Sequence, residues 1–193
     1  MDIVVATNNN GKLAEIRKIL SNYNVLSQRE VGADVDVDET GTTYEENALL
    51  KARAVRKYTD KIIIADDSGL EVDALNGEPG LYSARYAGEN TTPDQGMEKL
   101  LSKLDGIEFA DRSAHFVCCI TALMPDNTTH TFEGRCDGFI TEQKRGEGGF
   151  GFDPLFWTPE YKKTFSEIGD EQKNKISHRF RALKSLKEFL DNM

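Results

Sequence analysis

The stretch I-V-V-A-T-N-N-N-G-K, residues 3–12, shows the order of elements that decides the fold. Residues 3–6 are apolar and mostly β-branched, which is typical of a strand buried on both faces. The polar residues that follow interrupt this run. Apolar side chains then recur at helical spacing from Leu13 to Leu20, so we expect a helix that opens at Lys12. The chain therefore begins as strand, polar loop and helix.

Further strand and helix signals follow along the chain. We expect, in order, a helix capped by Thr43, a strand at 62–65 that ends before Asp66, strand and turn at 72–80, a helix from Thr92, a hairpin with strands at 113–124 and 128–135, and a last helix capped by Ser177. Asn47 and Lys51 lie one turn apart on the same face of the second helix. The mixture predicts an α/β architecture with a mixed sheet. Because no repeat or linker interrupts it, we expect residues 1–193 to form a single domain.

Composition narrows the class of protein. The 193 residues are 38% hydrophobic and 30% charged, as in ordinary globular proteins, and no apolar run reaches the length of a membrane span. We therefore expect a cytoplasmic protein without a membrane partner. The net charge of -9 argues against nucleic acid as the main partner, because polyanions are bound through clustered cations. Cys118, Cys119 and Cys136 have no paired spacing and read as reduced core thiols.

The polar loop at residues 7–12 suits an anion. Backbone N–H groups and a helix N-terminus point at one place there, and Lys12 adds a positive charge. The loop is not a Walker A motif, because Leu13 stands where Ser or Thr would bind magnesium. The alternative is a polar turn with a capping Asn.

The acidic pair Asp66-Asp67 follows a buried strand, and strand ends in α/β sheets gather ligands and metals. Adjacent residues of an extended chain point to opposite sides, so one carboxylate of the pair faces the site. Magnesium takes one or two protein carboxylates together with substrate phosphate oxygens. Asp38 or Glu39 could supply the second one. The alternative is an acidic turn.

Two blocks nearer the C-terminus could contact an organic ligand. S-H-R at 177–179 places Arg179 in the first turn of a helix, where the helix dipole disfavours a cation, which hints at an anionic or carbonyl partner. G-G-F-G-F-D-P at 148–154 holds two aromatic rings among glycines, and such rings could stack on a purine. The alternatives are a surface arginine and two core anchors.

Together these blocks resemble one family, the inosine/xanthosine triphosphate pyrophosphatases that clear non-standard purine nucleotides. The matching stretches are T-N-N-N-G-K (7–12), E-T-G-T-T-Y-E-E-N-A-L-L-K-A (39–52), A-D-D-S-G-L (65–70), P-G-L-Y-S-A-R-Y (79–86), G-G-F-G-F-D-P (148–154) and S-H-R (177–179). They span nearly the whole chain.

The resemblance implies an elongated mixed β-sheet with flanking helices and two lobes around a central nucleotide-binding cleft, in a homodimer. It implies hydrolysis of ITP, dITP and XTP to the monophosphate and diphosphate with Mg²⁺. The metal would be held by Glu39 and Asp67, with Asp67 also the general base. The implied substrate-binding residues are Thr7, Asn8, Asn9, Asn10, Gly11, Lys12, Lys51, Ser68, Phe150, Gly151, Phe152, Asp153, Lys173, His178 and Arg179.

Selectivity would follow from hydrogen-bond donors in the base pocket. Hypoxanthine and xanthine carry a carbonyl at position 6, where adenine carries an amino group, so donors on His178 and Arg179 would disfavour adenine. Other classes remain open: a pyrophosphatase for pyrimidine or other modified nucleoside triphosphates, a nucleotide sensor without catalysis, and a nucleic-acid-binding module.

Overall fold

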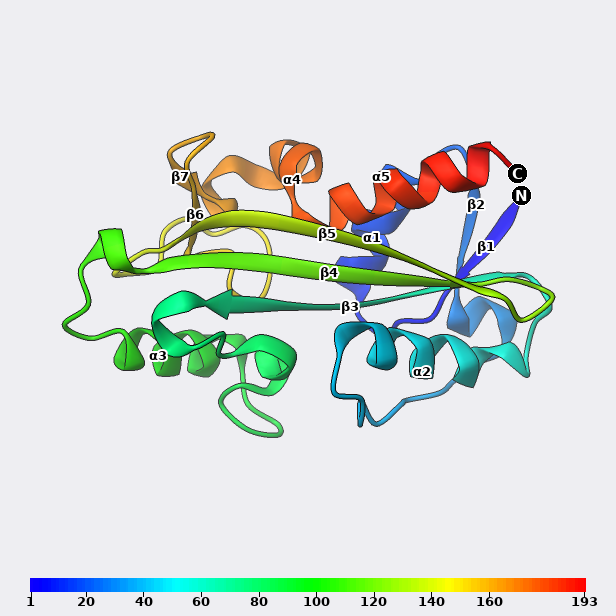
Figure 1. Cartoon of the computed structure of the whole chain (residues 1–193), viewed down its shortest axis with the longest axis horizontal. Helices are drawn as coiled ribbons and strands as arrows, with labels where there is room; N and C mark the ends of the chain where they lie inside the picture. Colours follow the sequence, from blue (N-terminus) through cyan, green and yellow to red (C-terminus); the bar gives the residue numbers. More distant parts are fainter. The chain divides into compact units, whose positions relative to one another are not determined.

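The computed structural model describes residues 1–193, which form a mixed sheet flanked by helices (Figure 1). The strands are β1 (Asp2–Val5), β2 (Asn24–Ser27), β3 (Ile62–Val72), β4 (Ser113–Leu123), β5 (Thr129–Ile140), β6 (Phe156–Thr158) and β7 (Lys163–Thr164). The helices are α1 (Asn10–Ile19), α2 (Tyr44–Arg56), α3 (Pro93–Lys103), α4 (Phe165–Ile176) and α5 (His178–Asp191). Short 3₁₀ turns join several of them.

The seven strands follow the order β2-β1-β3-β4-β5-β6-β7. β1 pairs in parallel with both β2 and β3, whereas β6 pairs antiparallel with β5 and β7. Parallel neighbours need a crossover connection, and α1 and α2 lie in the two crossovers at this end of the sheet. The expected α/β class with a mixed sheet is confirmed.

The chain divides into two compact units, and the first comprises residues 1–67, 118–134 and 179–193. Its central strands β1 and β3 are buried on both faces. One face packs against α1 and α5 through a cluster that includes Ile3, Val5, Ile62, Ile64, Ile16, Leu20, Leu183 and Leu186. The other face packs against α2 through Val4, Ala6, Ile63, Ala65, Ala48, Ala52 and Val55. This alternation explains why residues 3–6 read as an unbroken apolar run.

The second unit comprises residues 68–117 and 135–178 and has its own core. That core is richer in aromatic rings: Phe116, Phe156 and Phe165 pack with centroids 4.6–5.9 Å apart. α3 contributes Met97, Leu100 and Leu104 to the same cluster. Thr92 and Gln95 form a reciprocal capping box at the start of α3, at the position where the sequence predicts the helix to begin.

One expectation about the elements is wrong, and one helix was not expected. β3 does not end before Asp66 but continues through the acidic pair to Val72, because cations pair both carboxylates. Ser177 lies between α4 and α5 with an extended backbone, directly before the last helix as expected, and its N–H also donates to Lys173 O at the end of α4, at 2.9 Å. α4 itself was not expected, although Thr164 and Glu167 form a capping box at its start.

The three cysteines are buried and form no disulfide, in keeping with core thiols. Burial raises the pKa of Cys119 to about 12, so its thiol stays protonated at neutral pH. None of the helices combines the length and the apolar character that a membrane crossing requires.

Candidate active site

Strand β3 presents its two aspartates to opposite faces of the first unit. Asp66 is on the face of Ile62 and Ile64, which pack against α1 and α5, and Asp67 is on the face of Ile63, which packs against α2. Both are buried, at 2% and 5% exposure. A buried carboxylate needs charged or hydrogen-bonding partners, and each finds a different set.

On the α2 face, Asp67 is held by two side chains one helical turn apart. Lys51 Nζ lies 3.1 Å from Asp67 Oδ1, and Asn47 Nδ2 donates to Asp67 Oδ2 at 3.2 Å. The same ammonium lies 2.9 Å from Glu39 Oε1, so Lys51 bridges two carboxylates. The shared face of Asn47 and Lys51 is the one that the sequence spacing indicates.

The loop that carries Glu39 is fastened to the start of α2. Thr43 Oγ1 accepts from Glu46 N at 3.1 Å, while Glu46 Oε2 accepts from Thr42 N at 2.7 Å. Gly41 N donates to Asn47 Oδ1 at 2.8 Å. A Cβ on Gly41 would lie 2.6 Å from that oxygen, so this close approach requires glycine.

The charges on this face shift each other. Burial raises the pKa of Asp67, and the nearby Glu39 adds to the rise, while Lys51 opposes it. Burial alone would lower the pKa of Lys51, but Asp67, Asp66 and Glu39 together raise it above its ordinary value. Lys51 therefore remains a cation, and Asp67 is a carboxylate with increased basicity, as suits a proton acceptor.

The donor set of Glu39 and Asp67 fits a divalent cation. Their oxygens both contact one ammonium group, so positive charge already occupies the position between them. No group of three or more His, Cys, Asp or Glu side chains that could hold a metal is present. Two carboxylates are nonetheless the usual protein share for Mg²⁺, whose remaining ligands are waters and substrate phosphates.

The polar loop before α1 uses its side chains to hold its own shape. Asn9 Oδ1 accepts from Lys12 N at 3.0 Å as the N-cap, and Thr7 Oγ1 accepts from Asn9 N at 3.1 Å. Asn8 donates to Val35 O at 3.0 Å and accepts from Gln28 Nε2 at 3.0 Å. The helix begins at Asn10, two residues earlier than expected. Asn9 caps the N–H of Lys12, and the N–H groups of Asn10 and Gly11 have no acceptor within the helix, which leaves them for an anion.

On the opposite face, Asp66 lies in a network of four charges. Its Oδ2 contacts Lys12 Nζ at 3.1 Å, Arg179 Nε at 3.2 Å and Arg179 Nη2 at 3.1 Å. Arg179 Nη1 donates to Glu15. Burial alone would raise the pKa of Asp66, but Lys12 and Arg179 lower it far below its usual range. Asp66 therefore stays ionised inside the protein.

In the second unit, Lys173 joins the residues of the glycine-rich loop. Its ammonium lies 2.7 Å from Asp153 Oδ2 and 4.4 Å from the ring centroid of Phe150. The same oxygen accepts from Phe150 N at 2.9 Å, and Gly149 adopts φ 78° beside it. A side chain at Gly149 would clash with Asp153. Lys173 is 2% exposed, so a full cation is buried against an aromatic ring.

Other predicted residues of this unit have structural contacts of their own. His178 stacks on Phe116 with centroids 4.7 Å apart, and Phe152 meets Tyr86 edge-on at 6.4 Å. Phe152 is 6% exposed and packs in the core of the second unit, as the alternative to a ring that stacks on a purine predicts. Ser68 follows Asp67 directly on β3, and Gly151 has φ 62° in the loop.

The predicted residues are divided between the two compact units. The first unit holds the 7–12 loop, Glu39, Lys51, Asp67 and Arg179, and the second holds Ser68, the 150–153 loop, Lys173 and His178. Glu15 and Asn47 were not predicted as site residues, and Asp66 was not chosen from its pair. The signal that could have identified Glu15 is its spacing, three residues after Lys12 and beside the apolar Ile16 on α1.

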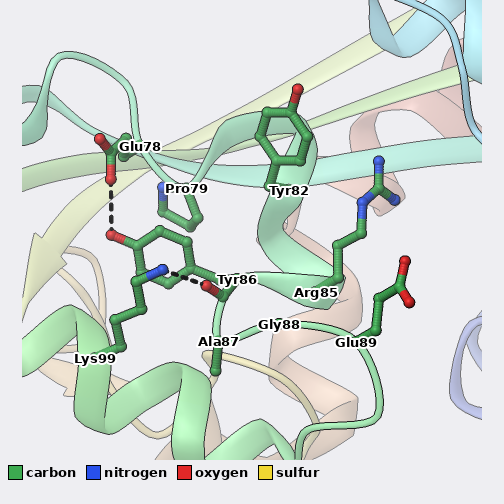
Figure 2. Close-up of a pocket in the computed structure, with 9 residues that line it drawn as sticks. All are labelled: Glu78, Pro79, Tyr82, Arg85, Tyr86, Ala87, Gly88, Glu89 and Lys99. Atoms are coloured by element: carbon green, nitrogen blue, oxygen red, sulfur yellow. Dashed lines mark hydrogen bonds between the residues drawn. The ribbon is translucent and has the colours of Figure 1, made fainter.

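A separate cavity of about 470 Å³ lies in the second unit (Figure 2). It is lined by Glu78, Pro79, Tyr82, Arg85, Tyr86, Ala87, Gly88, Glu89 and Lys99. Lys99 Nζ donates to Tyr86 O at 2.6 Å, and the Tyr86 hydroxyl donates to Glu78 at 3.0 Å. These hydrogen bonds connect three of the residues that line the cavity. None of the predicted site residues lines it.

The chain begins with a strand of a parallel sheet, a polar loop that caps the next helix, and lysines that contact buried carboxylates. These features define an α/β protein that handles phosphorylated ligands. The sequence pattern of the Ham1 family matches residues 3–189, and the chain belongs to this family.

Its relatives cover nearly the whole chain. A protein named dITP/XTP pyrophosphatase from Staphylococcus epidermidis is 50% identical over 190 residues, which are 98% of this chain and 96% of the relative. Among solved structures, the Ham1 protein of Staphylococcus aureus superposes with a TM-score of 0.88 at 49% identity, covering 100% of this chain and 99% of that one. A HAM1 protein from Coxiella burnetii gives a TM-score of 0.90 at 38% identity, with both chains fully covered.

Proposed function

We propose that this protein hydrolyses non-canonical purine nucleoside triphosphates, namely ITP, dITP and XTP, to the nucleoside monophosphate and diphosphate. The family and the names of its close relatives support this activity. Its role would be to remove such nucleotides from the precursor pool.

The observation that carries the proposal is the bridge made by Lys51. One half-buried ammonium contacts both Glu39 and Asp67, so two carboxylates and a cation converge on one place. Such a place can hold a cation between the carboxylates and present positive charge to a triphosphate.

In the proposed reaction, Asp67 accepts a proton from a water molecule as the water oxygen attacks the α-phosphorus. The bond between the α-phosphorus and the bridging oxygen of the diphosphate breaks, and diphosphate leaves with the bonding electrons. Lys12 and Lys51 offset the negative charge on the phosphate oxygens during this step. The raised pKa of Asp67 supports its role as the base.

Glu39 and Asp67 would hold Mg²⁺, which supplies charge neutralisation of the phosphates when bound. Asn47 orients Asp67 through one oxygen, and Lys51 contacts the other. These two contacts fix the orientation of the Asp67 carboxylate, so that it meets both the water molecule and the cation in one orientation.

The base would be read by the residues of the second unit. Phe150 offers a ring for stacking, and Lys173, held by Asp153, is a permanent donor beside that ring. A donor that faces position 6 accepts the carbonyl of hypoxanthine or xanthine and leaves the amino group of adenine unpaired. His178 would add a second donor. The guanidinium of Arg179 donates to Asp66 and Glu15, so its contact with the base stays a prediction.

We further propose that the protein works as a homodimer in the cytoplasm, where its substrates arise. Sedimentation of the purified protein at several concentrations tests the dimer.

The test of the function is incubation of the purified protein with ITP, XTP, ATP and GTP in magnesium, with chromatographic identification of products. We expect IMP and diphosphate from ITP, with ATP and GTP largely intact. IDP and orthophosphate would mean attack at the γ-phosphorus, contrary to the proposal. Faster turnover of pyrimidine nucleotides than of ITP would favour the related pyrophosphatase activity instead.

A further inference from the structure

Lys12 and Arg179 share one oxygen atom. Asp66 Oδ2 lies 3.1 Å from Lys12 Nζ and 3.1 Å from Arg179 Nη2, with Arg179 Nε at 3.2 Å. Asp66 and Arg179 are fully buried, at 2% and 1% exposure, whereas the side chain of Lys12 is 16% exposed. Lys12 is therefore the member of the group that reaches the outside.

This arrangement raises a difficulty for phosphate binding. The ammonium that the proposed function assigns to the triphosphate is already engaged by a buried carboxylate. If Lys12 turned to a phosphate and nothing replaced it, Asp66 would be left as a buried charge without a counter-ion, which is strongly unfavourable. Binding of the substrate would then be opposed by the cost of exposing that charge to a low-dielectric interior.

Arg179 removes the difficulty, because it contacts the same oxygen through two nitrogens. Its own charge is balanced from the other side, where Nη1 donates to Glu15 on α1. Two cations and two carboxylates give the group no net charge. When Lys12 leaves, the pair of Arg179 and Asp66 persists, and Glu15 continues to hold the guanidinium in place.

We propose that Arg179 is a positioning residue for phosphate binding: as the permanent counter-ion of Asp66, it allows Lys12 to exchange Asp66 for a substrate phosphate. This inference rests on the proposed function of Lys12 and adds to it. It differs from the expectation that Arg179 reads the base, because it assigns Arg179 an effect on a ligand that has no base at all.

The experiment measures binding of inorganic triphosphate by calorimetry in magnesium. In Arg179→Gln, Lys12 is the cation left to Asp66, so it is retained there and affinity falls, by about 5- to 150-fold if the coupling has the usual strength. The double variant Asp66→Asn with Arg179→Gln removes the carboxylate that retains Lys12, and it is expected to recover most of that loss. Arg179→Lys, which keeps the charge, is expected to recover affinity as well.

A matched control is Asp2→Asn, which removes the carboxylate of an exposed pair with Lys61 in the same unit (2.6 Å) and is expected to bind triphosphate as the wild type does. Equal affinity of Arg179→Gln and wild type would overturn the proposal, and so would a double variant that binds no better than Arg179→Gln. Should Arg179→Gln fail to fold, Arg179→Lys carries the test, and a loss within the range above would overturn it.

Parallel assays of ITP turnover separate this inference from the proposed function. Wild-type protein that binds triphosphate with the expected pattern but leaves ITP intact would refute the activity and keep the role of Arg179. Wild-type protein that binds no triphosphate would refute the role of Lys12 and, with it, that of Arg179.

Discussion

Asp66 and Asp67 are neighbours of the same residue type on one strand, yet the protein gives them opposite chemistry. Asp66 faces α1 and α5, where Lys12 and Arg179 lower its pKa. Asp67 faces α2, where burial raises its pKa despite Lys51. One carboxylate is a permanent anion inside a balanced network, and the other can take up a proton.

The difference shows that position along the chain does not set the role of an acidic residue. The alternation of the strand sends the two side chains to separate environments. The number of cations around each one then determines its proton affinity. A strand that carries two acids in succession can in this way supply a structural charge on one face and a reactive group on the other.

The comparison predicts its largest effect at Asp67. Asp67→Asn is expected to lower turnover of ITP by about 10²–10⁴-fold, because the general base is lost. The melting temperature should stay the same or rise, since the ionised group is disfavoured in the folded state. Steady-state kinetics and thermal unfolding measure the two quantities. Near-normal turnover would remove Asp67 from the mechanism and leave the two aspartates without a functional contrast.

Asp66→Asn is expected to act mainly on stability. It leaves Lys12 and Arg179 with Glu15 alone in a buried site, and breaking a buried pair in this way costs about 3–5 kcal/mol of unfolding free energy. Denaturant unfolding measures the loss. A stability within error of wild type would mean that solvent reaches the network and that Asp66 is not a buried structural charge.

Acid pH should change the contributions of Asp66 and Asp67 to folding stability in opposite directions. The folded-state pKa of Asp66 is lowered, so its stabilising contribution is present above the unfolded value of about 3.9 and is lost as pH falls towards the folded pKa. The folded-state pKa of Asp67 is raised, so its protonation on acidification favours the folded state. Unfolding measured from pH 7 to pH 3 should therefore be less acid-sensitive in Asp66→Asn than in wild type. Equal acid sensitivity would contradict the assignment for Asp66.

The smallest expected effect is the shift that replacement of Lys51 causes in the pH profile, separate from its contribution to phosphate stabilisation. Because this cation holds the pKa of Asp67 down, Lys51→Met should raise it further and move the acidic limb of the kcat/KM profile to higher pH. The matched change Lys61→Met removes an exposed cation of the same unit and should leave the limb in place. A limb that does not move in Lys51→Met would mean that another group controls it.

Much of the fold could be predicted from the sequence, because local signals agree with the tertiary structure. The apolar run at residues 3–6 forms β1, and the cap at Thr43 starts α2. The course of β3 could not be predicted, because its acidic pair reads as a strand end when its partners are unknown. The partners of Asp66, which are Lys12 and Arg179, lie 54 and 113 residues away in sequence.

In the candidate site too, features set by local spacing could be predicted, whereas contacts between distant residues could not. The shared face of Asn47 and Lys51 follows from helical spacing, and the capping role of Asn9 follows from its place before α1. The engagement of Arg179 with Asp66 and Glu15 does not, because it depends on three elements that meet only in the folded unit. Sequence spacing carries no information about such a meeting.

Gly41 has a further consequence through the amide of Asn47. That amide accepts from Gly41 N with its oxygen and donates to Asp67 with its nitrogen, so one rigid plane spans the loop and the strand. The Asn47 side chain therefore sets the distance between the Glu39 loop and Asp67. A bulkier residue at position 41 would not simply disturb a turn. It would change the spacing of the two carboxylates, and with it the size of the cation that they can share.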